Sequence, residues 1–526
     1  MVCICAGLMF CGCTDKEVLQ EISVSNPTKL VVTLRIDEKA LGAGSRTASE
    51  YGATDAESKV NSLTLFYVTV DGGGKETLQS AQTIVDPDIS QVLKFEFQAN
   101  KGMTKRFYLA ANMNDAQKAA FTGDKSCYDL APADLDANYS NVVDLMDVDA
   151  DTGVGSNILM TARITQSNQQ NINVDAGEIS IDTPVKLDRV VSKVLLTCKT
   201  STTDGDTHAQ VKGDAGWTKL EDMRYMGNMF SRKLFLFPQK DETNNPSDPN
   251  YSMSEFIVQD DHGNYVVCPE EYKDYIDNYQ FYDLYQKLDM LQQPSDKIKP
   301  YYKVVKYDAA RLNSSSPNLY TEGLYFPENR VNNDISFSAM GDYTLPQTIA
   351  MTSRLVSTHL MVTARFVPKT VTIDDGGALK VVTAASENEM LTNYLKECSE
   401  DLMGETKNYP QGTFWYYNNT YYTLEGMKSF LKQEASLGKN TSRGDIERFD
   451  GGWGYYYTFI DGTANNGVID HNGQVSWGLT RNHYYMLNVT NLVPPGSSIP
   501  GNKLIKIPTE QLEWVDKGGS DITVVP

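Results

Sequence analysis

The sequence predicts an all-β protein with minor helices, organised as two tandem β-sandwich domains with Greek-key connections. Three observations support this fold class. The chain holds 30 tyrosines and many runs of valine, threonine and tyrosine, which favour strands. Several segments alternate apolar and polar residues with the period of a half-buried strand. With 526 residues, the chain is also too long for one ordinary core.

The first domain begins with an amphipathic segment, "KLVVTLRID", at residues 29–37. Its residues alternate between two faces, with Leu30, Val32, Leu34 and Ile36 on one face and Val31, Thr33, Arg35 and Asp37 on the other. Further strands are predicted at residues 59–70, 92–100, 105–114, 158–166 and 188–200, with a hairpin turn at 71–76 and a short helix at 114–123.

A segment dense in Pro, Asn and Asp, "KDETNNPSDPN", predicts a domain boundary near residue 240. Residues 270–291 then mix Tyr, Phe and Leu without a clear period, so we interpret them as either a helix or an irregular segment. Strands are predicted again at 323–330, 359–373, 413–424, 453–461 and 481–493. The run "PPGSSIPGN" indicates a flexible linker, after which residues 503–526 are apolar and strand-like.

The first thirteen residues, "MVCICAGLMFCGC", form an uncharged apolar run that is too short to span a bilayer as a helix. A small residue followed by a cysteine at the end of such a run resembles the lipobox of a bacterial lipoprotein, in which Cys13 carries the lipid. The run lacks the basic start of a signal peptide, so we expect the true translation start upstream. Phe10 and Cys11 also depart from the usual lipobox, and a frayed apolar terminus is the alternative interpretation.

The formal net charge of −21 argues against nucleic acid and anionic membrane surfaces as partners. Of the eight cysteines, four lie in the leader and the others are far apart without a CxxC pair, so a structural zinc site is not expected. Cys198 is predicted to be a small core residue in an apolar strand. Whether Cys127, Cys198, Cys268 and Cys398 form disulfides stays open.

An acidic segment is the first candidate for metal binding. Asp147, Asp149 and Asp151 alternate, but an EF-hand needs Gly at the sixth position and Glu at the twelfth, where Thr152 and Ile158 stand. A solvated acidic loop is therefore the preferred interpretation, with a loosely bound calcium ion as the alternative. We predict no metal site and no other cofactor.

Enzymatic motifs are also missing from the sequence. Gly42 and Gly44 follow a strand, but a dinucleotide fingerprint needs a third glycine where Thr47 stands. The five histidines form no metal-binding spacing, and His359 and His483 begin predicted strands. No GxSxG motif is present. We therefore predict that the protein is not an enzyme and has no catalytic residue.

Aromatic residues gather in "WYYNN", "NNTYY" and "WGYYY". Such residues can stack on sugars or anchor a protein interface. Cross-strand packing within a sheet is the preferred interpretation.

Two features need another explanation. The amphipathic segment at 29–37 is followed by an open loop, "ALGAGSRTASEYG", with Arg46 at its centre, so a cut there would make this strand detachable. Its departure would leave an apolar groove with unpaired strand edges, which is a template for β-augmentation by another chain. If a neighbour's tail fills that groove, the contact is head-to-tail and propagates as a filament. The tail residues suited to this role are Leu504, Ile505, Ile507, Leu512, Trp514, Ile522 and Val524.

These features resemble the major fimbrial subunits of Bacteroidales, which form type V pili. Cys13 stands where these subunits are lipidated, and Arg46 stands where an arginine-specific protease trims the precursor. The uncharged leader and a tyrosine-rich insert around 270–325 depart from the family pattern. The matching motifs, which extend over most of the chain, are "KVNSLTLFYV", "LDRVVSKVLLTCKT" with Arg189 and Lys193, "LYFPENR", "HLMVTARFVPK", "LTRNHYYMLNVTNLVPPG" and "LEWV".

The resemblance implies two transthyretin-like sandwich domains in a non-enzymatic structural protein. It also implies a palmitate-bearing, lipid-anchored precursor in the outer membrane, which is cut between Arg46 and Thr47. The mature subunits, stalk subunits because a tail is present, then polymerise by donor-strand exchange into adhesive surface fibres. The implied segments are a signal peptide at 1–13, a propeptide at 14–46, domains at 47–240 and 241–495, and a donor segment at 496–526.

The implied partners are identical or related fimbrial subunits, the processing protease and a host or bacterial surface ligand. The main alternative is a surface lipoprotein, such as a tip or accessory adhesin, that binds glycan or protein and does not polymerise. Which part of the tail supplies the donor strand, "KLIKI", "DITVV" or both, stays open.

Overall fold

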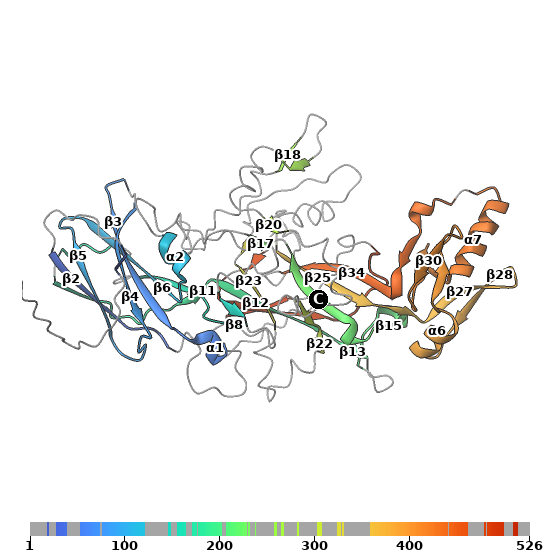
Figure 1. Cartoon of the computed structure of the whole chain (residues 1–526), viewed down its shortest axis with the longest axis horizontal. Helices are drawn as coiled ribbons and strands as arrows, with labels where there is room; N and C mark the ends of the chain where they lie inside the picture. The colour runs from blue at the N-terminus through green and yellow to red at the C-terminus, as the bar shows by residue number, and fades with distance from the viewer. Residues whose placement is uncertain are drawn as a thin grey trace, which may run out of the picture.

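Strands dominate the computed structural model, and the predicted mainly β fold class with minor helices is confirmed. Figure 1 shows an elongated molecule with N-terminal strands at the left, a second group of sheets in the middle and a small helix-containing part at the right. The described residues are 18–19, 28–38, 53–73, 76–120, 146–148, 155–164, 171–175, 177–201, 207–228, 230–231, 237, 257–259, 265–267, 281–282, 302–307, 323–327, 329–330, 358–439, 441–460, 478–479, 481–498 and 509–513.

The N-terminal sandwich consists of two sheets. The larger sheet has the order β1 (Val18–Leu19), β4 (Glu76–Val85), β3 (Ser62–Val70), β6 (Thr104–Ala111), β9 (Met160–Ile164) and β11 (Asp188–Arg189). The smaller sheet has the order β10 (Gly177–Ser180), β2 (Thr28–Leu34) and β5 (Leu93–Ala99).

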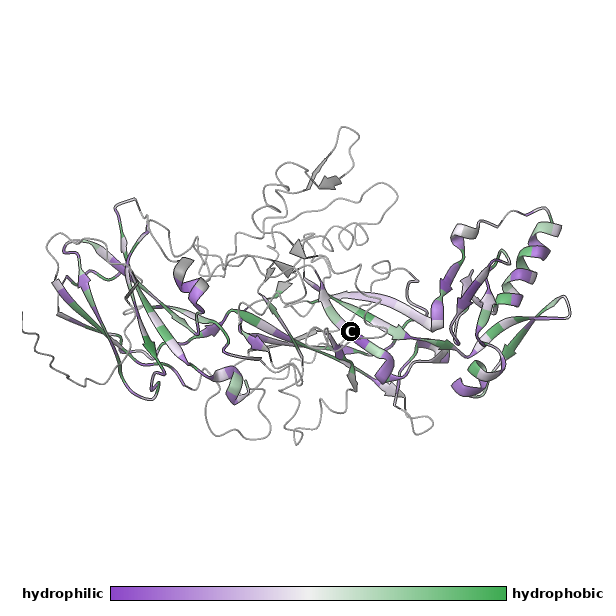
Figure 2. Ribbon diagram, in the orientation of Figure 1, coloured by the Kyte–Doolittle hydropathy of each residue, from purple (hydrophilic) through white to green (hydrophobic). Residues whose placement is uncertain are grey.

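One apolar core fills the space between these two sheets. In β5, buried and more exposed residues alternate along the strand. Figure 2 shows green and purple residues alternating along several strands of this sandwich. Phe95 and Phe97 of the smaller sheet share the core with Leu65, Phe107 and other residues of the larger sheet. The alternation of apolar and polar residues therefore determines which side of each strand faces the core.

The second sandwich packs a mixed sheet on an antiparallel one. The mixed sheet has the order β22 (Lys306–Tyr307), β12 (Val191–Cys198), β36 (His483–Val489) and β37 (Thr509–Glu513), with β23 (Leu324–Pro327) also paired to β12. The antiparallel sheet has the order β21 (Tyr302–Val304), β16 (Met223–Asn228), β25 (His359–Arg365) and β34 (Trp453–Phe459).

The chain crosses from the N-terminal sandwich to the second sandwich between β11 and β12. β11 pairs with β9 of the N-terminal sandwich, whereas β12 pairs in parallel with β36, nearly 300 residues later in the sequence. The strand partners therefore change near residue 190. The segment that predicts a domain boundary near residue 240 lies outside the described residues, so that boundary stays a prediction. The long separation of β12 from β36 explains why local sequence patterns could not locate this change.

The sandwiches share a continuous apolar contact. Phe66 and Tyr108 on the outer face of the larger N-terminal sheet lie 6.0 and 4.8 Å from Phe237, measured between ring centroids. These residues belong to the same buried cluster as the core of the second sandwich. β3 is consequently buried on both faces, with every residue from Leu63 to Val70 buried.

A third part, which we call the distal lobe (residues 370–449), is inserted before β34 of the second sandwich. The sequence analysis did not separate this lobe from the rest of the chain. Its sheet has the order β28 (Ala378–Thr383), β27 (Thr370–Asp375), β32 (Thr420–Tyr422), β31 (Phe414–Tyr417) and β33 (Glu447–Phe449). The lobe also contains α6 (Glu387–Asn393), the pair β29 (Cys398–Glu400) and β30 (Thr406–Tyr409), and α7 (Leu424–Ser436).

Helix α7 lies against the distal sheet through its apolar side. Thr423 caps its start by accepting a hydrogen bond of 3.2 Å from the Gly426 amide to its side-chain oxygen. A Cβ atom at Gly426 would lie 2.2 Å from the Thr372 carbonyl oxygen, so a glycine is required for this close approach. Leu424 and Met427 are buried at helical spacing.

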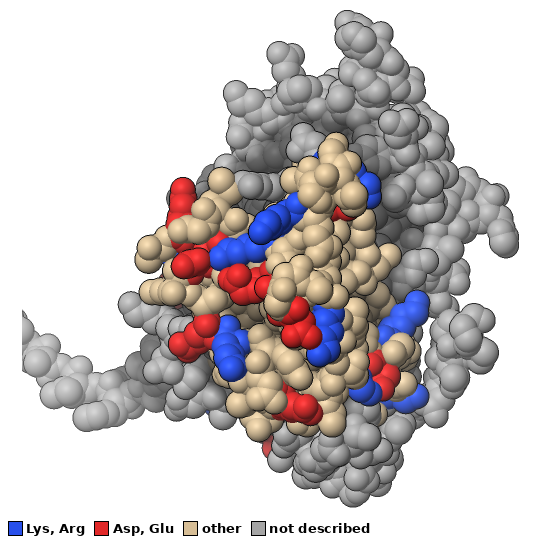
Figure 3. All heavy atoms as spheres, turned by 90° about the vertical axis from the view of Figure 1, so that its right-hand side faces the viewer, with Lys and Arg blue, Asp and Glu red and all other residues tan. Residues whose placement is uncertain are grey.

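The exposed end of the distal lobe carries mixed charges. Figure 3 shows acidic and basic residues interspersed there, without a broad patch of one sign. Several form ion pairs, such as Lys380 with Asp375 at 2.9 Å and Lys428 with Glu400 at 3.0 Å. Exposed pairs of this kind contribute little to stability.

The remaining elements are short. No helix among the described residues has the length and apolar composition needed to cross a membrane. The short elements are α1 (Asp55–Ser58), α2 (Asp115–Ala120), four 3-10 turns (Lys212–Asp214, Leu220–Asp222, Arg443–Asp445 and Asp450–Gly452), β7 (Asp147–Val148), β8 (Gly155–Ser156), β13 (Thr200–Ser201), β14 (His208–Ala209), β15 (Gly216–Trp217), β17 (Phe230–Ser231), β18 (Ile257–Gln259), β19 (Tyr265–Val267), β20 (Phe281–Tyr282), β24 (Asn329–Arg330), β26 (Val367–Pro368) and β35 (Gly478–Leu479).

Candidate functional site: the β2 site and the sandwich junction

β2 is the central strand of its sheet, and we call the position it fills between β5 and β10 the β2 site. β2 pairs antiparallel with β5 over residues 28–34 and parallel with β10 over residues 30–33. Leu30, Val32, Leu34 and Ile36 expose 0%, 0%, 1% and 4% of their surface. The strand and the inward orientation of these four side chains are therefore as the sequence predicts.

The burial of these four side chains contributes a large free energy of stabilisation for one strand. At roughly 1.5–3 kcal/mol each, it gives about 6–12 kcal/mol, an upper estimate because the unfolded chain already buries some apolar surface. The net stability of a whole domain is about 5–15 kcal/mol. A sandwich that loses β2 therefore needs another strand in its place.

The side chains beneath β2 come from both sheets and include many aromatic rings. Tyr67 lies 5.7 Å from both Phe97 and Phe107, measured between ring centroids. All three residues are buried in the core that β2 covers. Among the described strands, β5 and β10 pair only with β2, so its departure would leave both with an unpaired edge.

Upstream of β2, β1 contacts the other sheet of the same sandwich. Val18 stands opposite Gln82 of β4, and Leu19 stands opposite Ala81. The segment before the predicted cut thus contributes to both sheets. Sequence reasoning missed β1 because the surrounding polar residues show no alternation.

Cys13, Arg46 and Thr47 lie outside the described residues. β2 is followed by residues described up to 38, and the chain is described again from Ala53, which is fully buried. Helix α1 starts shortly after with a capping box, in which the Thr54 hydroxyl accepts from the Glu57 amide at 3.2 Å and Glu57 Oε2 accepts from the Thr54 amide at 2.6 Å.

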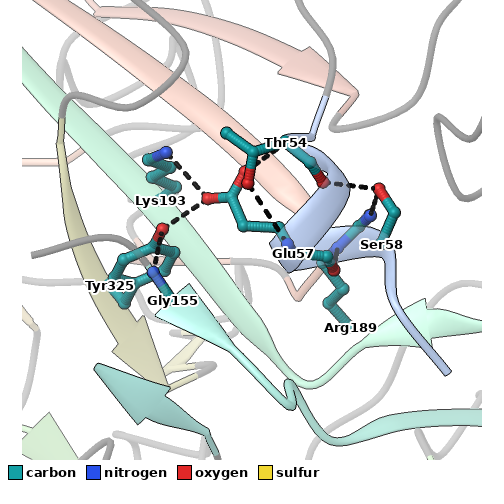
Figure 4. A network of polar contacts seen from close by, with 7 residues as sticks. All are labelled: Thr54, Glu57, Ser58, Gly155, Arg189, Lys193 and Tyr325. Atoms are coloured by element: carbon teal, nitrogen blue, oxygen red, sulfur yellow. Dashed lines mark hydrogen bonds and ion pairs between the residues drawn. The ribbon is translucent and has the colours of Figure 1, made fainter. Parts of the chain in front are cut away.

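The Glu57 carboxylate also joins α1 to the second sandwich, as Figure 4 shows. Its other oxygen, Oε1, accepts a hydrogen bond of 2.8 Å from Lys193 Nζ on β12 and one from the Tyr325 hydroxyl on β23. The Gly155 amide donates to the Tyr325 hydroxyl at 2.9 Å. We call Thr54, Glu57, Ser58, Gly155, Arg189, Lys193 and Tyr325 the junction cluster.

Arg189 forms the second connection within the junction cluster. Its Nε donates to the Glu57 carbonyl at 3.1 Å, and one terminal nitrogen lies 3.4 Å from the Ser58 hydroxyl. The other terminal nitrogen donates to Asn482 Oδ1 at 3.1 Å. Arg189 and Lys193, both singled out in the "LDRVVSKVLLTCKT" motif, thus meet the same short helix.

The electrostatics of the cluster follow from its burial. Burial raises the pKa of Glu57, but the Lys193 ammonium and the hydrogen bonds from Lys193, Tyr325 and Thr54 outweigh it, so the pKa lies below its ordinary value. Burial, together with the nearby Glu57 carboxylate, raises the pKa of Tyr325 well above its ordinary value. The cluster is therefore a charged carboxylate held by a cation and a neutral phenol, an arrangement suited to fixing segments in place.

Glu57 was not predicted as a site residue. The signal that could have found it is the local sequence "TDAE" at residues 54–57, a capping-box pattern before a strand. Its partners Lys193 and Tyr325 lie 136 and 268 residues further along the chain, which local patterns do not reveal.

Part of the predicted donor segment pairs within its own chain. β37 lies antiparallel to β36, with Leu512 opposite Tyr484. Ser497, in the predicted linker, pairs with Tyr455 through backbone hydrogen bonds of 2.9 and 3.0 Å. The linker is thus anchored at its start. Outside the described residues lie Leu504, Ile505, Ile507, Trp514, Ile522 and Val524.

The structure places the other candidate residues as follows. Asp147 accepts a hydrogen bond of 2.9 Å from Asn157, while Asp149 and Asp151 lie outside the described residues. The described part of the chain contains no group of three or more His, Cys, Asp or Glu side chains suited to a metal ion. His359 and His483 begin β25 and β36, as predicted.

Cys198 is a buried core residue, as predicted, and neither Cys198 nor Cys398 forms a disulfide with a described residue. Cys127 and Cys268 lie outside the described residues. The aromatic clusters serve packing: Trp415 and Tyr456 each expose 2% of their surface, and Tyr416 lies 5.2 Å from Tyr421 across the β31–β32 hairpin. The preferred cross-strand interpretation is confirmed for these residues.

The N-terminal sandwich is similar to a known protein family. Residues 28–189 match the family model of the major fimbrial subunit protein (FimA), from the first residue of β2 to the last of β11. Similar solved structures include a fimbrilin from Porphyromonas gingivalis, at 14% identity and a TM-score of 0.39, covering 94% of this chain and 99% of the other. A cell adhesion protein from Parabacteroides distasonis has 10% identity, a TM-score of 0.39 and the same coverages.

The tip fimbrial protein Mfa3 from Porphyromonas gingivalis is similar at 12% identity and a TM-score of 0.31, covering 93% of this chain and 100% of that one. No curated protein matches the chain. The family resemblance therefore rests on the family model, over residues 28–189. Over residues 28–189, which form the sandwich that contains the β2 site, the predicted resemblance to the FimA major fimbrial subunit family is confirmed.

Proposed function

We propose that the protein is a fimbrial subunit that polymerises by strand exchange after the loop around Arg46 is cut. The observation that carries this proposal is the position of β2. It fills the centre of a sheet with four buried aliphatic side chains, and the chain that connects it to the body contains Arg46. The family match over residues 28–189 supports the same function.

In this proposal the protein is exported as a lipoprotein precursor with the lipid on Cys13, which holds it at the outer membrane. An arginine-specific protease cuts between Arg46 and Thr47, and residues 14–46 leave the sandwich. The C-terminal segment of another copy, or of a related fimbrial subunit, then enters between β5 and β10. Each contact is head-to-tail, so the assembly grows as a surface fibre. The chemistry is that of a structural protein and not of an enzyme.

Three parts of residues 496–526 are candidates for the donor strand. Residues 509–513 lie on β36 of their own chain, so they serve as donor only if this pair opens. Otherwise the donor comes from "KLIKI" before them or "DITVV" after them. Three sets of aspartate substitutions distinguish these cases: Leu504, Ile505 and Ile507; Leu512 and Trp514; or Ile522 and Val524. The set that abolishes fibres marks the donor.

The decisive experiment treats the purified precursor with an arginine-specific protease and follows fibres by electron microscopy. We expect fibres whose subunits begin at Thr47 by N-terminal mass analysis. Deletion of residues 503–526 is expected to leave cleavable monomers. A trimmed wild-type protein that stays monomeric would instead indicate a surface adhesin that does not polymerise. A mature chain that starts elsewhere would contradict the assigned cut.

A further inference from the structure

Among the described strands, β10 pairs only with β2, as β5 does. The residues just after β10 also bond to the β2 segment. Ile181 donates to the Thr33 carbonyl at 2.8 Å, and Val185 donates to the Arg35 carbonyl at 2.7 Å. When β2 leaves, β10 loses these bonds, although it forms one wall of the site that a donor strand must enter.

The lead-in to β10 has an attachment that does not involve β2. Ile172 exchanges two backbone hydrogen bonds with Lys105 of β6, at 2.8 and 2.9 Å. Three residues later, the Asp175 carboxylate lies 3.1 Å from Lys105 Nζ. Lys105 therefore contacts this segment twice, through its backbone and through its ammonium group.

Further hydrogen bonds hold both members of the Lys105–Asp175 ion pair in place. The Lys105 side chain is fully buried, whereas the Asp175 side chain is 46% exposed. Lys105 Nζ also donates to the Met103 carbonyl at 2.8 Å, and Asp175 Oδ1 accepts from the Gly102 amide at 2.8 Å. The amide and the ammonium hold the pKa of Asp175 below its ordinary value. Among the described residues, Asp175 is the ion-pair partner of the buried Lys105 ammonium, and this contact fixes the carboxylate in a defined place.

Asp175 also contacts β2 from its backbone. The Thr28 hydroxyl, at the first residue of β2, donates to the Asp175 carbonyl at 2.6 Å and lies 3.2 Å from the Ala99 carbonyl of β5. The Asp175 backbone thus meets β2, while its side chain meets the body of the sandwich. Removal of β2 breaks the first contact and leaves the second intact.

We propose that Lys105 and Asp175 are positioning residues for strand exchange, holding β10 in place after β2 leaves so that a donor strand finds both edges of the site. The apolar side chains of Ile179 and Ile181 keep β10 against the core, but apolar contacts are not directional. The ion pair is directional, so it holds the residues just before β10 at a fixed position on β6. This inference rests on the proposed strand exchange.

The test compares the full-length Lys105→Met variant with the wild type before and after trimming at Arg46. Methionine keeps an unbranched apolar side chain in the buried position and removes the ammonium group. Lys380→Met is the matched control, because Lys380 pairs with Asp375 on the exposed surface of the distal lobe. Asp175→Ala removes the same contact from its exposed side, in case Lys105→Met fails to fold.

The first readout is hydrogen exchange of the Ile172 amide, whose bond to the Lys105 carbonyl does not involve β2. The second readout is the rate of fibre elongation. In the precursor, where β2 holds β10, we expect exchange in the variants to match the wild type. After trimming, we expect about tenfold faster exchange and about tenfold slower elongation, the scale of one lost hydrogen bond between charged groups. The Lys380→Met control is expected to match the wild type in both readouts.

Two results would overturn the proposal. One is wild-type exchange and elongation in the trimmed Lys105→Met and Asp175→Ala variants. The other is an equal increase in exchange before and after trimming, which would mark a general structural role. If the trimmed wild type does not form fibres at all, the proposed function fails, while the exchange comparison still decides whether the ion pair holds β10.

Discussion

Glu57 and Lys193 form a buried ion pair, with a distance of 2.8 Å between carboxylate and ammonium and with 0% and 1% of their side chains exposed. The two residues lie 136 positions apart, on α1 and on the first strand of the second sandwich. The first described helix after the predicted cut is therefore fixed to the sandwich junction. A cut at Arg46 would free the chain before the cut and leave this junction closed.

Loss of either partner of this pair is expected to destabilise the protein strongly. Lys193→Met leaves the Glu57 carboxylate buried without its cation, and we expect a loss of about 3–5 kcal/mol in the free energy of unfolding. Urea denaturation followed by tryptophan fluorescence measures this loss. Lys380→Met, which removes an exposed pair, is expected to have no measurable effect.

A double substitution separates the charge from the packing. Glu57→Leu combined with Lys193→Met removes both charges, so we expect it to be less destabilising than Lys193→Met alone. The same urea experiment decides the matter. A double variant that is as unstable as the sum of the two single variants would show that the ion pair is not the source of the effect.

The same carboxylate predicts a loss of stability in acid. The pKa of Glu57 is lower in the folded protein than in the unfolded chain, so its contribution is present above the unfolded pKa and is lost as the pH falls through the folded pKa. With an ordinary value of 4.5 for Glu, the loss begins below about pH 4.5. Unfolding measured from pH 7 to pH 3 should show a shallower decline for Glu57→Gln than for the wild type.

How far the sequence predicts this structure depends on the range of the interactions. The alternation at residues 29–37 predicts both β2 and its buried face, because a half-buried strand leaves its pattern in a few residues. The hairpin turn between β3 and β4 and the helix α2 follow from local signals in the same way. For the chain 424–436, no helix is predicted, although Thr423 caps α7 and Leu424 and Met427 follow at helical spacing.

The residues of the candidate site also differ in whether local sequence patterns predict them. The four aliphatic residues of β2 are predictable, whereas β1, the Lys105–Asp175 pair and the junction cluster are not. Lys105 and Asp175 lie 70 positions apart, and Glu57 and Tyr325 lie 268 apart. Such pairs depend on how the sheets are arranged, which the period of one strand does not determine.

A substitution on the inward face of β2 is expected to act only while β2 is present. Leu30→Ala removes a fully buried side chain, and we expect a loss of about 2–5 kcal/mol in the unfolding free energy of the precursor. The trimmed and assembled protein no longer contains this residue, so its stability should equal that of the wild type. Val31→Ala, at a half-buried position on the opposite face, is the matched control and should cost less. An equal effect of Leu30→Ala before and after trimming would show that β2 stays in place.

Two arginines lie near the predicted cut, and we expect the protease to use only one. Arg35 has an exposed side chain, but its carbonyl accepts a hydrogen bond of 2.7 Å from the Val185 amide, which ties its backbone to the sheet. Arg46 stands in a segment of Gly, Ala and Ser, a composition typical of loops that proteases cut. Arg46→Ala should therefore leave the precursor uncut and unable to form fibres, whereas Arg35→Ala should be trimmed at the wild-type rate. Mass analysis of the products over time tests both variants, and a product that begins at Ile36 in the wild type would contradict the assignment of Arg46.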